Sequence, residues 1–194
     1  MGVLLSAGLS ISWFAEKILG KSATSEEIAG LLREAEEVAP GADGVEFIPS
    51  LNGTRTPVVD PTARGSLTGL SVAHGRGHVI RAMVEGVCMT FNESLQLMSN
   101  SASPIVDLVA SGGGARAALW RQTLSDVSGL PVRATADDEH SALGAAVAAA
   151  RGIGVDLEPL ISRHLTSTCV PDPRRHALYV ELAEARIQRI RQEN

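Results

Sequence analysis

The chain has 194 residues, of which 44% are hydrophobic and 20% are charged, and this composition is sufficient for one ordinary hydrophobic core. Its formal net charge is −5 and only 3% of its residues are aromatic, so it lacks the basic surface and stacking side chains of a dedicated nucleic-acid-binding protein. No uninterrupted apolar stretch approaches the roughly 18–20 residues that span a bilayer, and no role in a membrane is expected.

Two helices are predicted near the N-terminus. Apolar residues at helical spacing predict the first over residues 11–19, with Gly20 as its C-terminal cap. The second begins at Ser25 and runs to about residue 38. It carries much of the acidic surplus, because residues 24–46 hold seven acidic residues against one arginine.

The longest predicted element is an amphipathic helix over residues 78–97. Three segments precede it: a break at residues 40–44, a short strand at residues 45–48 and an irregular stretch at residues 49–69. Gly86 lies inside the helix, where glycine costs about 1 kcal/mol of propensity, so we expect another backbone to approach closely there. Cys88 is expected to be a buried free thiol, since two cysteines cannot form a disulfide framework.

The second half of the chain alternates strands with helices. The strands are expected at residues 105–110 and 131–135, and the helices at residues 116–127, 139–151 and 176–191. The first strand is a nearly continuous apolar run, so we expect it to be covered on both faces. This alternation indicates an α/β fold in one compact unit.

The strongest local motif is the run of three glycines at residues 112–114, which follows the first of these strands. Glycines let a flat ligand or a phosphate approach the main chain, and the free N–H groups of a following helix favour an anion. A plain tight turn is another explanation. The spacing Gly112-x-Gly114-x-x-Ala117, with Asp137 about twenty residues on, also fits a dinucleotide site.

Two further patterns are interpreted as structural. Residues 15–22 match a relaxed phosphate-loop pattern ending in Gly20-Lys21-Ser22, but the intervening residues complete a helix, so this is a helix end. His74 and His78 are four residues apart, but two glycines separate them and no third ligand is evident, so we expect no metal site.

Four motifs, in order from about residue 8 to residue 155, resemble the FGGY carbohydrate kinases and in particular their xylulokinase branch. Residues 65–85 (GSLTGL, then HVIRAMVE) are similar to the second FGGY signature, and residues 47–65 (FIPSLNGTRTP, then DP and RG) to the stretch before it. Residues 111–122 (SGGGAR, then LWRQ) resemble the adenosine-side loop, and residues 141–146 (SALGAA) the helix after it. This resemblance displaces the dinucleotide interpretation.

The resemblance implies a ribonuclease-H-like, actin-like ATPase fold of the α/β class. Two such domains close over a cleft in the family, with the sugar mainly on the N-terminal side and ATP mainly on the C-terminal side. An aspartate takes the proton from a sugar hydroxyl, which attacks the γ-phosphate of Mg-ATP. The branch implies D-xylulose as the sugar and D-xylulose 5-phosphate as the product.

The resemblance also assigns site residues. The residues expected against the adenosine and α-phosphate are Gly113, Gly114 and Ala115, with Ala117 where relatives often carry Ser or Asn. The residues that match the second signature, and that are expected to be mainly structural, are Gly65, Gly69, His78 and Glu85. Glu85 is expected to accept structural hydrogen bonds rather than a substrate proton.

The departures from the family concern length. Family chains are more than twice as long, so the catalytic aspartate, the second Gly-Thr phosphate loop and the leading strands are expected to precede residue 1. We therefore expect no catalytic residue in this chain, with Mg²⁺ and the sugar bound mainly through residues outside it. The chain is interpreted as one partial C-terminal FGGY domain over residues 1–194, with a helical lead-in (1–44), a core (45–155) and a C-terminal extension and helix (156–194).

A second class of function stays open, namely a non-catalytic nucleotide-binding or interaction module derived from such a kinase. Family analogy makes a homodimer a candidate assembly, and a cytoplasmic location is expected. On either interpretation the ligand expected in this chain is ATP or ADP.

Overall fold

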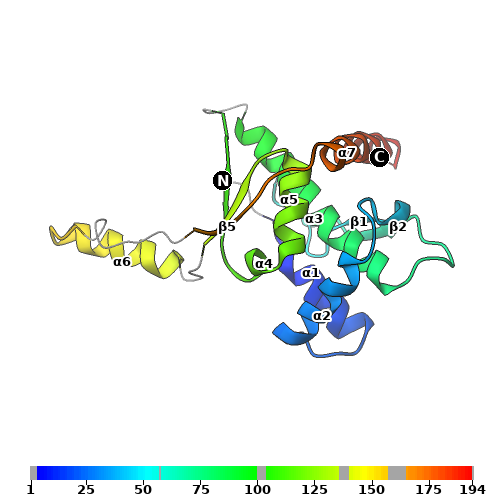
Figure 1. The fold of residues 1–194 in the computed structure, drawn as a ribbon, viewed down its shortest axis with the longest axis horizontal. Coiled ribbons are helices and arrows are strands. Elements are labelled where there is room, and N and C mark those ends of the chain that lie inside the picture. The colour runs from blue at the N-terminus through cyan, green and yellow to red at the C-terminus, as the bar shows by residue number, and fades with distance from the viewer. Residues whose placement is uncertain (1–3, 57, 100–103, 136–139, 157–164, 194) are drawn as a thin grey trace.

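The structure is a computed structural model that describes residues 4–56, 58–99, 104–135, 140–156 and 165–193 (Figure 1). The helices of the chain are α1 (Ala7–Trp13), α2 (Ser25–Glu36), α3 (Arg76–Ser99), α4 (Gly113–Arg116), α5 (Ala118–Ser128), α6 (His140–Gly152) and α7 (Pro173–Glu193). The strands are β1 (Glu46–Ile48), β2 (Ser66–Thr68), β3 (Leu108–Ala110), β4 (Val132–Thr135) and β5 (Leu165–Cys169). No helix of these described residues is both long enough and apolar enough to cross a membrane.

The two N-terminal helices lie where the apolar spacing predicts them. α1 continues into a π-helical stretch, Phe14–Ile18, and Gly20 then adopts a φ of +66°. The interpretation of residues 15–22 as a helix end is therefore confirmed. α2 begins one residue after its cap: the side chain of Thr24, rather than Ser25, accepts a hydrogen bond from the N–H of Glu27 at 3.2 Å.

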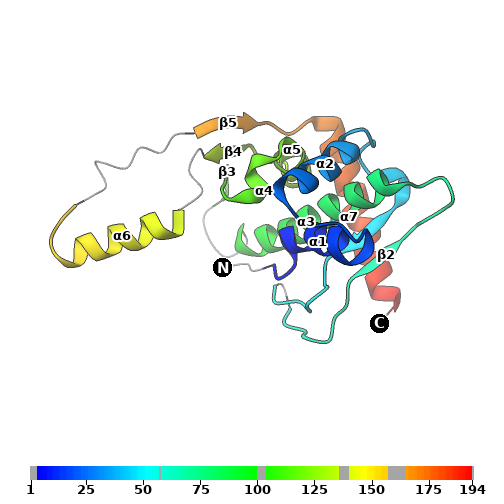
Figure 2. The ribbon, with the colours of Figure 1, turned by 90° about the horizontal axis from the view of Figure 1, so that it is seen from below.

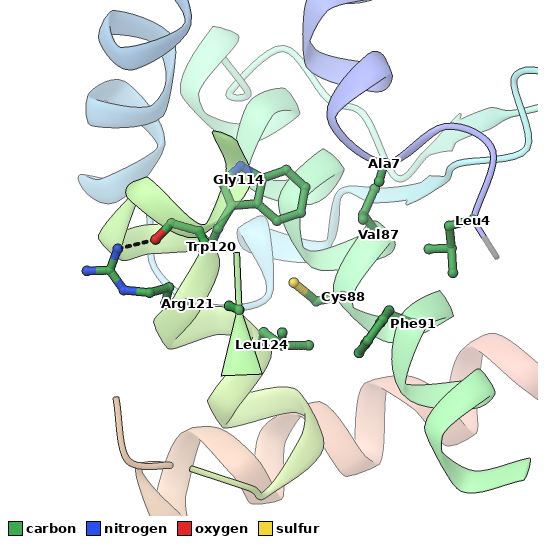
Figure 3. A pocket seen from close by; sticks show the side chains of 11 residues that line it. Leu4, Ala7, Val87, Cys88, Phe91, Gly114, Trp120, Arg121 and Leu124 are labelled. Carbon is green, nitrogen blue, oxygen red and sulfur yellow. Dashed lines mark hydrogen bonds between the residues drawn. The ribbon is translucent and has the colours of Figure 1, made fainter. Parts of the chain in front are cut away.

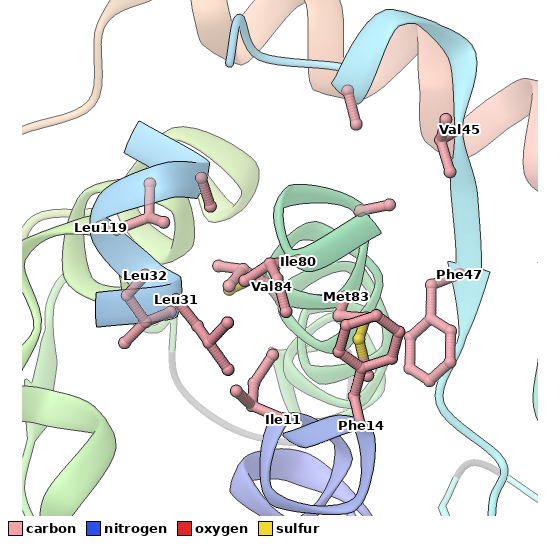
Figure 4. Packing of buried hydrophobic residues seen from close by; sticks show 14 of the residues in the cluster. Ile11, Phe14, Leu31, Leu32, Val45, Phe47, Ile80, Met83, Val84 and Leu119 are labelled. Carbon is pink, nitrogen blue, oxygen red and sulfur yellow. The ribbon is translucent and has the colours of Figure 1, made fainter. Parts of the chain in front are cut away.

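The hydrophobic core is centred on α3, which packs against α2, α5 and β1. Figure 4 shows side chains of α3 pointing toward residues of α1, α2 and β1. The labelled residues are Ile11, Phe14, Leu31, Leu32, Val45, Phe47, Ile80, Met83, Val84 and Leu119, all of them buried. A Cβ on Gly86 would lie 2.0 Å from the carbonyl oxygen of Phe47, so the predicted close backbone approach is confirmed.

β1 pairs with β2 in an antiparallel ribbon, with Phe47 opposite Leu67. The sequence predicts β1, but β2 falls in the stretch from residue 49 to residue 69 that was expected to be irregular. A strand of three residues next to several turns gives too short a periodic pattern to be recognised.

A second sheet has the strand order β3-β4-β5. β3 is parallel to β4, as expected for a strand-helix-strand unit, and β5 adds an antiparallel edge that no local pattern in the sequence predicts. The expectation that the first strand is covered on both faces is wrong for the described residues. Val106 is 74% exposed and Val109 is 61% exposed, because no described element packs over them.

The last two helices differ in how much they contact the rest of the chain. Figures 1 and 2 both show α6 projecting away from the helices around α3, and Leu143 on α6 is exposed. α7 packs instead against α5, and its Tyr179 is 1% exposed. Asp126 on α5 anchors the start of α7, since its carboxylate accepts the N–H of Asp172 at 2.8 Å and lies 3.3 Å from a guanidinium nitrogen of Arg175.

Candidate functional site

The glycine segment, residues 111–117, connects β3 to α5. Gly112 has a φ of +82°, which favours glycine, and α4 begins directly after it. The sequence pattern predicts one helix from residue 116. The structure instead starts a short helix at Gly113 and breaks it at Ala117, whose extended backbone (ψ 126°) separates α4 from α5.

Gly113 and Gly114 have no internal steric reason to be glycine. A Cβ built on either residue would meet no atom within 4 Å, and neither residue has a positive φ. The space outside this backbone is therefore open. Glycine here leaves the main chain accessible from that space, as a ligand that approaches the backbone requires.

A cavity of about 710 Å³, which we call the large cavity, opens in front of these glycines. Its walls come from α1, α2 and the glycine segment with the start of α5, and it is lined by Ala7, Gly8, Ile11, Ser12, Ala23, Ser25, Ile28, Ala29, Leu32, Arg33, Glu36, Gly113, Gly114, Arg116, Ala117 and Trp120. The volume falls within the range typical of small-molecule sites, roughly 300–1,000 Å³.

The chemistry of this lining is mixed. Ala7, Ile28 and Ala29, none of them buried, provide an apolar wall on which a flat heterocycle can pack. The hydroxyl groups of Ser12 and Ser25 are in reach of the same space. Arginine side chains and the backbone near Gly113 are suited to phosphate oxygens. These residue types fit a nucleoside phosphate.

Three of the four residues expected to touch a nucleotide line the large cavity: Gly113, Gly114 and Ala117. Ala115 does not. It is 9% exposed and lines a smaller, neighbouring cavity of about 280 Å³. The contact of Ala115 with a nucleotide stays a prediction.

The helical residues of the large cavity were not found from the sequence. Gly8 and Ser12 on α1 are four residues apart, and Arg33 and Glu36 on α2 are three apart, so each pair lies on one helix face. In α1, the small residue Gly8 followed four positions later by the polar Ser12 was the sequence signal that this helix face could line a cavity. The acidic surplus of residues 24–46 is typical of a solvated helix and gives no indication of a cavity.

The smaller cavity is mainly apolar. Figure 3 shows Leu4, Val87, Phe91 and Leu124 around it, with the sulfur of Cys88 among them. Burial raises the pKa of the Cys88 thiol far above its usual range, and the nearby Glu85 carboxylate acts in the same direction. The thiol is therefore protonated at neutral pH and is a poor nucleophile.

The two cavities share a wall. Ala7, Gly114 and Trp120 line both, and Figure 3 shows the indole of Trp120 beside Gly114. Arg121, the next residue of α5, lines only the smaller cavity.

The signature residues lie outside both cavities. Gly65 and Gly69 flank β2 in close packing: a Cβ would lie 2.8 Å from Leu51 at the first and 2.1 Å from the carbonyl oxygen of Gly44 at the second. Gly69 also has a φ of +77°.

Glu85 and His78 make contacts within the chain. One carboxylate oxygen of Glu85 accepts hydrogen bonds from the N–H of Gly41 (3.0 Å), from Nε of Arg81 (2.6 Å) and from the hydroxyl of Tyr179 (2.8 Å). Burial raises the pKa of that hydroxyl, and Glu85 raises it further. His78 accepts the N–H of Gly75 at Nδ1 (3.1 Å), and its Nε2 lies 3.2 Å from a carboxylate oxygen of Asp43.

His74 and His78 have ring centroids 5.2 Å apart, and Nδ1 of His74 accepts the N–H of Ser71 at 2.9 Å. Within the described ranges, no group of three or more histidine, cysteine or acidic side chains is arranged to hold a metal ion. Asp137, the acidic residue of the dinucleotide pattern, lies outside those ranges.

Residues 1–153 match the C-terminal domain of the FGGY family of carbohydrate kinases. The chain belongs to this family. It is 37% identical to the xylulose kinase of Bacillus subtilis (strain 168) over 154 residues, which cover 79% of this chain and 30% of that relative. It is 31% identical to the gluconokinase of Bacillus licheniformis over 191 residues, which cover 94% of this chain and 36% of that relative.

Solved structures of FGGY kinases agree with the fold. The xylulose kinase of Rhodospirillum rubrum superposes with a TM-score of 0.78 at 32% identity, over 92% of this chain and 36% of that one. A glycerol kinase of Plasmodium falciparum, solved with ADP, superposes with a TM-score of 0.74 at 22% identity, over 94% of this chain and 37% of that one. The chain thus has the α/β, actin-like ATPase fold of these kinases and spans about a third of the length of the relatives.

Proposed function

We propose that the large cavity binds the adenosine and α-phosphate of ATP or ADP. The observation that carries this proposal is that Gly113 and Gly114 lie open on the cavity although packing within the chain does not require glycine there. The apolar wall on α1 and α2 would hold the base, and the main chain of the glycine segment would lie against the sugar and α-phosphate. The glycerol kinase with ADP among the structural neighbours supports a nucleotide of this kind.

We propose further that the chain is the nucleotide-binding part of a kinase that transfers the γ-phosphate of ATP to a sugar hydroxyl, with D-xylulose as the first candidate. The xylulose kinase relatives support this sugar, and the gluconokinase relatives make gluconate the comparison to test. The general-base aspartate and most sugar contacts are assigned to residues outside this chain. ATP would supply the phosphoryl group. Mg²⁺ is commonly held by phosphate oxygens and water with only one or two carboxylates, and we assign those carboxylates to residues outside this chain.

Calorimetric titration of the 194-residue chain with ATP, ADP and NAD tests the nucleotide proposal. We expect ATP and ADP to bind and NAD to bind more weakly. Gly113→Val should abolish measurable binding, because its side chain would fill the space in front of the backbone. Gly144→Val is the matched control: Gly144 also has no neighbour within 4 Å but lies on α6, and it does not line the cavity.

The same titration separates the two classes of function. A well-folded chain without affinity for ATP or ADP would overturn the nucleotide proposal and favour an interaction module. Production of sugar phosphate by the isolated chain, from ATP and D-xylulose or gluconate, would overturn the assignment of the catalytic aspartate to residues outside it.

A further inference from the structure

Arg121 lies on the first turn of α5, which directly follows the glycine segment. Its guanidinium Nη1 donates hydrogen bonds to the carbonyl oxygens of Ala115 and Arg116, the latter at 2.9 Å. These are the last two carbonyls of α4. A helix of only four residues satisfies few of its own carbonyl groups, so it depends on donors from outside.

The glycine segment needs such support more than an ordinary turn does. Three consecutive glycines, residues 112–114, lose more backbone entropy on ordering than any other residue type. A Cβ built at any of the three positions would contact no atom outside the segment. Packing of neighbouring side chains against these glycines therefore does not hold their backbone in place. The charge-assisted bonds from Arg121 are therefore well placed to fix the course of this backbone.

Arg121 does not line the candidate nucleotide site. It lines the smaller cavity, where Figure 3 shows its hydrogen bond to the glycine segment, and it is not among the residues of the large cavity. Its two hydrogen bonds to the carbonyls of Ala115 and Arg116 are therefore the route by which Arg121 would influence a nucleotide.

We propose that Arg121 is a positioning residue for nucleotide binding: by holding the carbonyls of Ala115 and Arg116, it keeps the Gly113–Gly114 backbone in its place on the large cavity. This inference rests on the proposed function for its effect on ATP. The ordering of the glycine segment can be measured without any nucleotide.

Arg121→Met and Gln122→Met form a matched pair for the test. Gln122 is the neighbouring residue on α5 and also donates two hydrogen bonds, to Asp126 and to the carbonyl of Val170, both at 2.9 Å. These bonds lead toward β5 and α7 and not to the glycine segment. Arg121→Lys is a third variant, since one Arg121 nitrogen makes both bonds and an ammonium group can replace it in part.

Two measurements are made on the whole chain: hydrogen–deuterium exchange of residues 112–117 without nucleotide, and the Kd for ATP. We expect Arg121→Met to speed exchange in this segment and to weaken ATP binding about tenfold, the effect of losing one or two charge-assisted hydrogen bonds. Gln122→Met should change neither quantity, and Arg121→Lys should recover part of the affinity.

Equal exchange of residues 112–117 in the Arg121→Met and Gln122→Met variants would overturn the proposal. Unchanged ATP affinity together with faster exchange would also overturn it, because positioning would then not matter for binding. If the unsubstituted chain binds no ATP, the proposed function fails on its own, and the exchange measurement still decides whether Arg121 orders the segment.

Discussion

At the scale of single residues, the glycines of this chain serve two opposite purposes. Gly69 and Gly86 are required by packing, because a side chain would collide with a backbone carbonyl at each. Gly113 and Gly114 face open space. Gly75 and Gly144 face open space too, so openness alone does not mark a ligand site. Gly113 and Gly114 differ from these two in that they also line the large cavity.

The buried Cys88 thiol predicts a pH dependence of stability. The thiol keeps its proton in the folded chain, whereas in the unfolded chain it ionises above about pH 8.5. Its contribution to the free energy of unfolding is therefore present below pH 8.5 and is lost as the pH rises, by at most about 1.4 kcal/mol per pH unit. We expect Cys88→Ala to be less stable at pH 7 and to lose stability less steeply between pH 8.5 and 10, as measured by urea unfolding.

Cys169→Ala is the control for this measurement, because Cys169 is partly exposed on β5. It should keep the steep alkaline loss of the unsubstituted chain. Identical slopes for the Cys88→Ala variant and the unsubstituted chain would show that burial does not hold the thiol proton.

At the scale of elements, β1 and α3 are joined by the contact between Phe47 and Gly86. Gly86→Ala would place a methyl group against the Phe47 carbonyl, and we expect the free energy of unfolding to fall by about 3 kcal/mol. Gly144→Ala in the open helix α6 should not destabilise the chain. Urea unfolding measures both, and equal stability of the two variants would contradict the tight approach of β1 to α3.

Local patterns predict most elements of this fold, and the exceptions have physical reasons. The apolar spacing of α3 and the glycine inside it are local signals, so both the helix and the close backbone contact could be predicted. β5 could not, because its pairing with β4 joins residues thirty or more apart across the whole of α6. The apolar run of β3 predicts burial, yet Val109 is exposed. Burial of a strand requires other elements to pack on it, and the run itself does not show whether they do.

The candidate site was predictable only in part for a similar reason. Its glycines form one contiguous motif, whereas Ser12 and Arg33 join the same cavity from two separate helices. Their spacing shows that they share a face with other residues, but not that α1 and α2 turn those faces toward the glycine segment.

At the scale of the whole molecule, the C-terminal helix belongs to the core although the family match ends at residue 153. Tyr179 of α7 bonds both Arg81 and Glu85 of α3, and Arg186 is buried against α3, donating to Thr90 at 2.8 Å. We expect a chain of residues 1–172 to lose cooperative unfolding in urea, because these partners and an apolar face of α3 would be exposed to water.

A chain of residues 1–189 is the control for this truncation, because it keeps Tyr179 and Arg186. It should unfold as cooperatively as the 194-residue chain, with a similar dependence on urea concentration. A stable, cooperative 1–172 chain would show that α7 is an appendage.

The shared wall between the two cavities also gives the molecule a spectroscopic property. Indole emission responds to the polarity around the ring, and Trp120 borders both the large cavity and the smaller one. The second tryptophan, Trp13, lines a different cavity, beside Phe14 and Leu67, so replacing it by phenylalanine would leave a single tryptophan. Filling the large cavity then changes the emission of one known ring, and the protein reports its own occupancy without an added label.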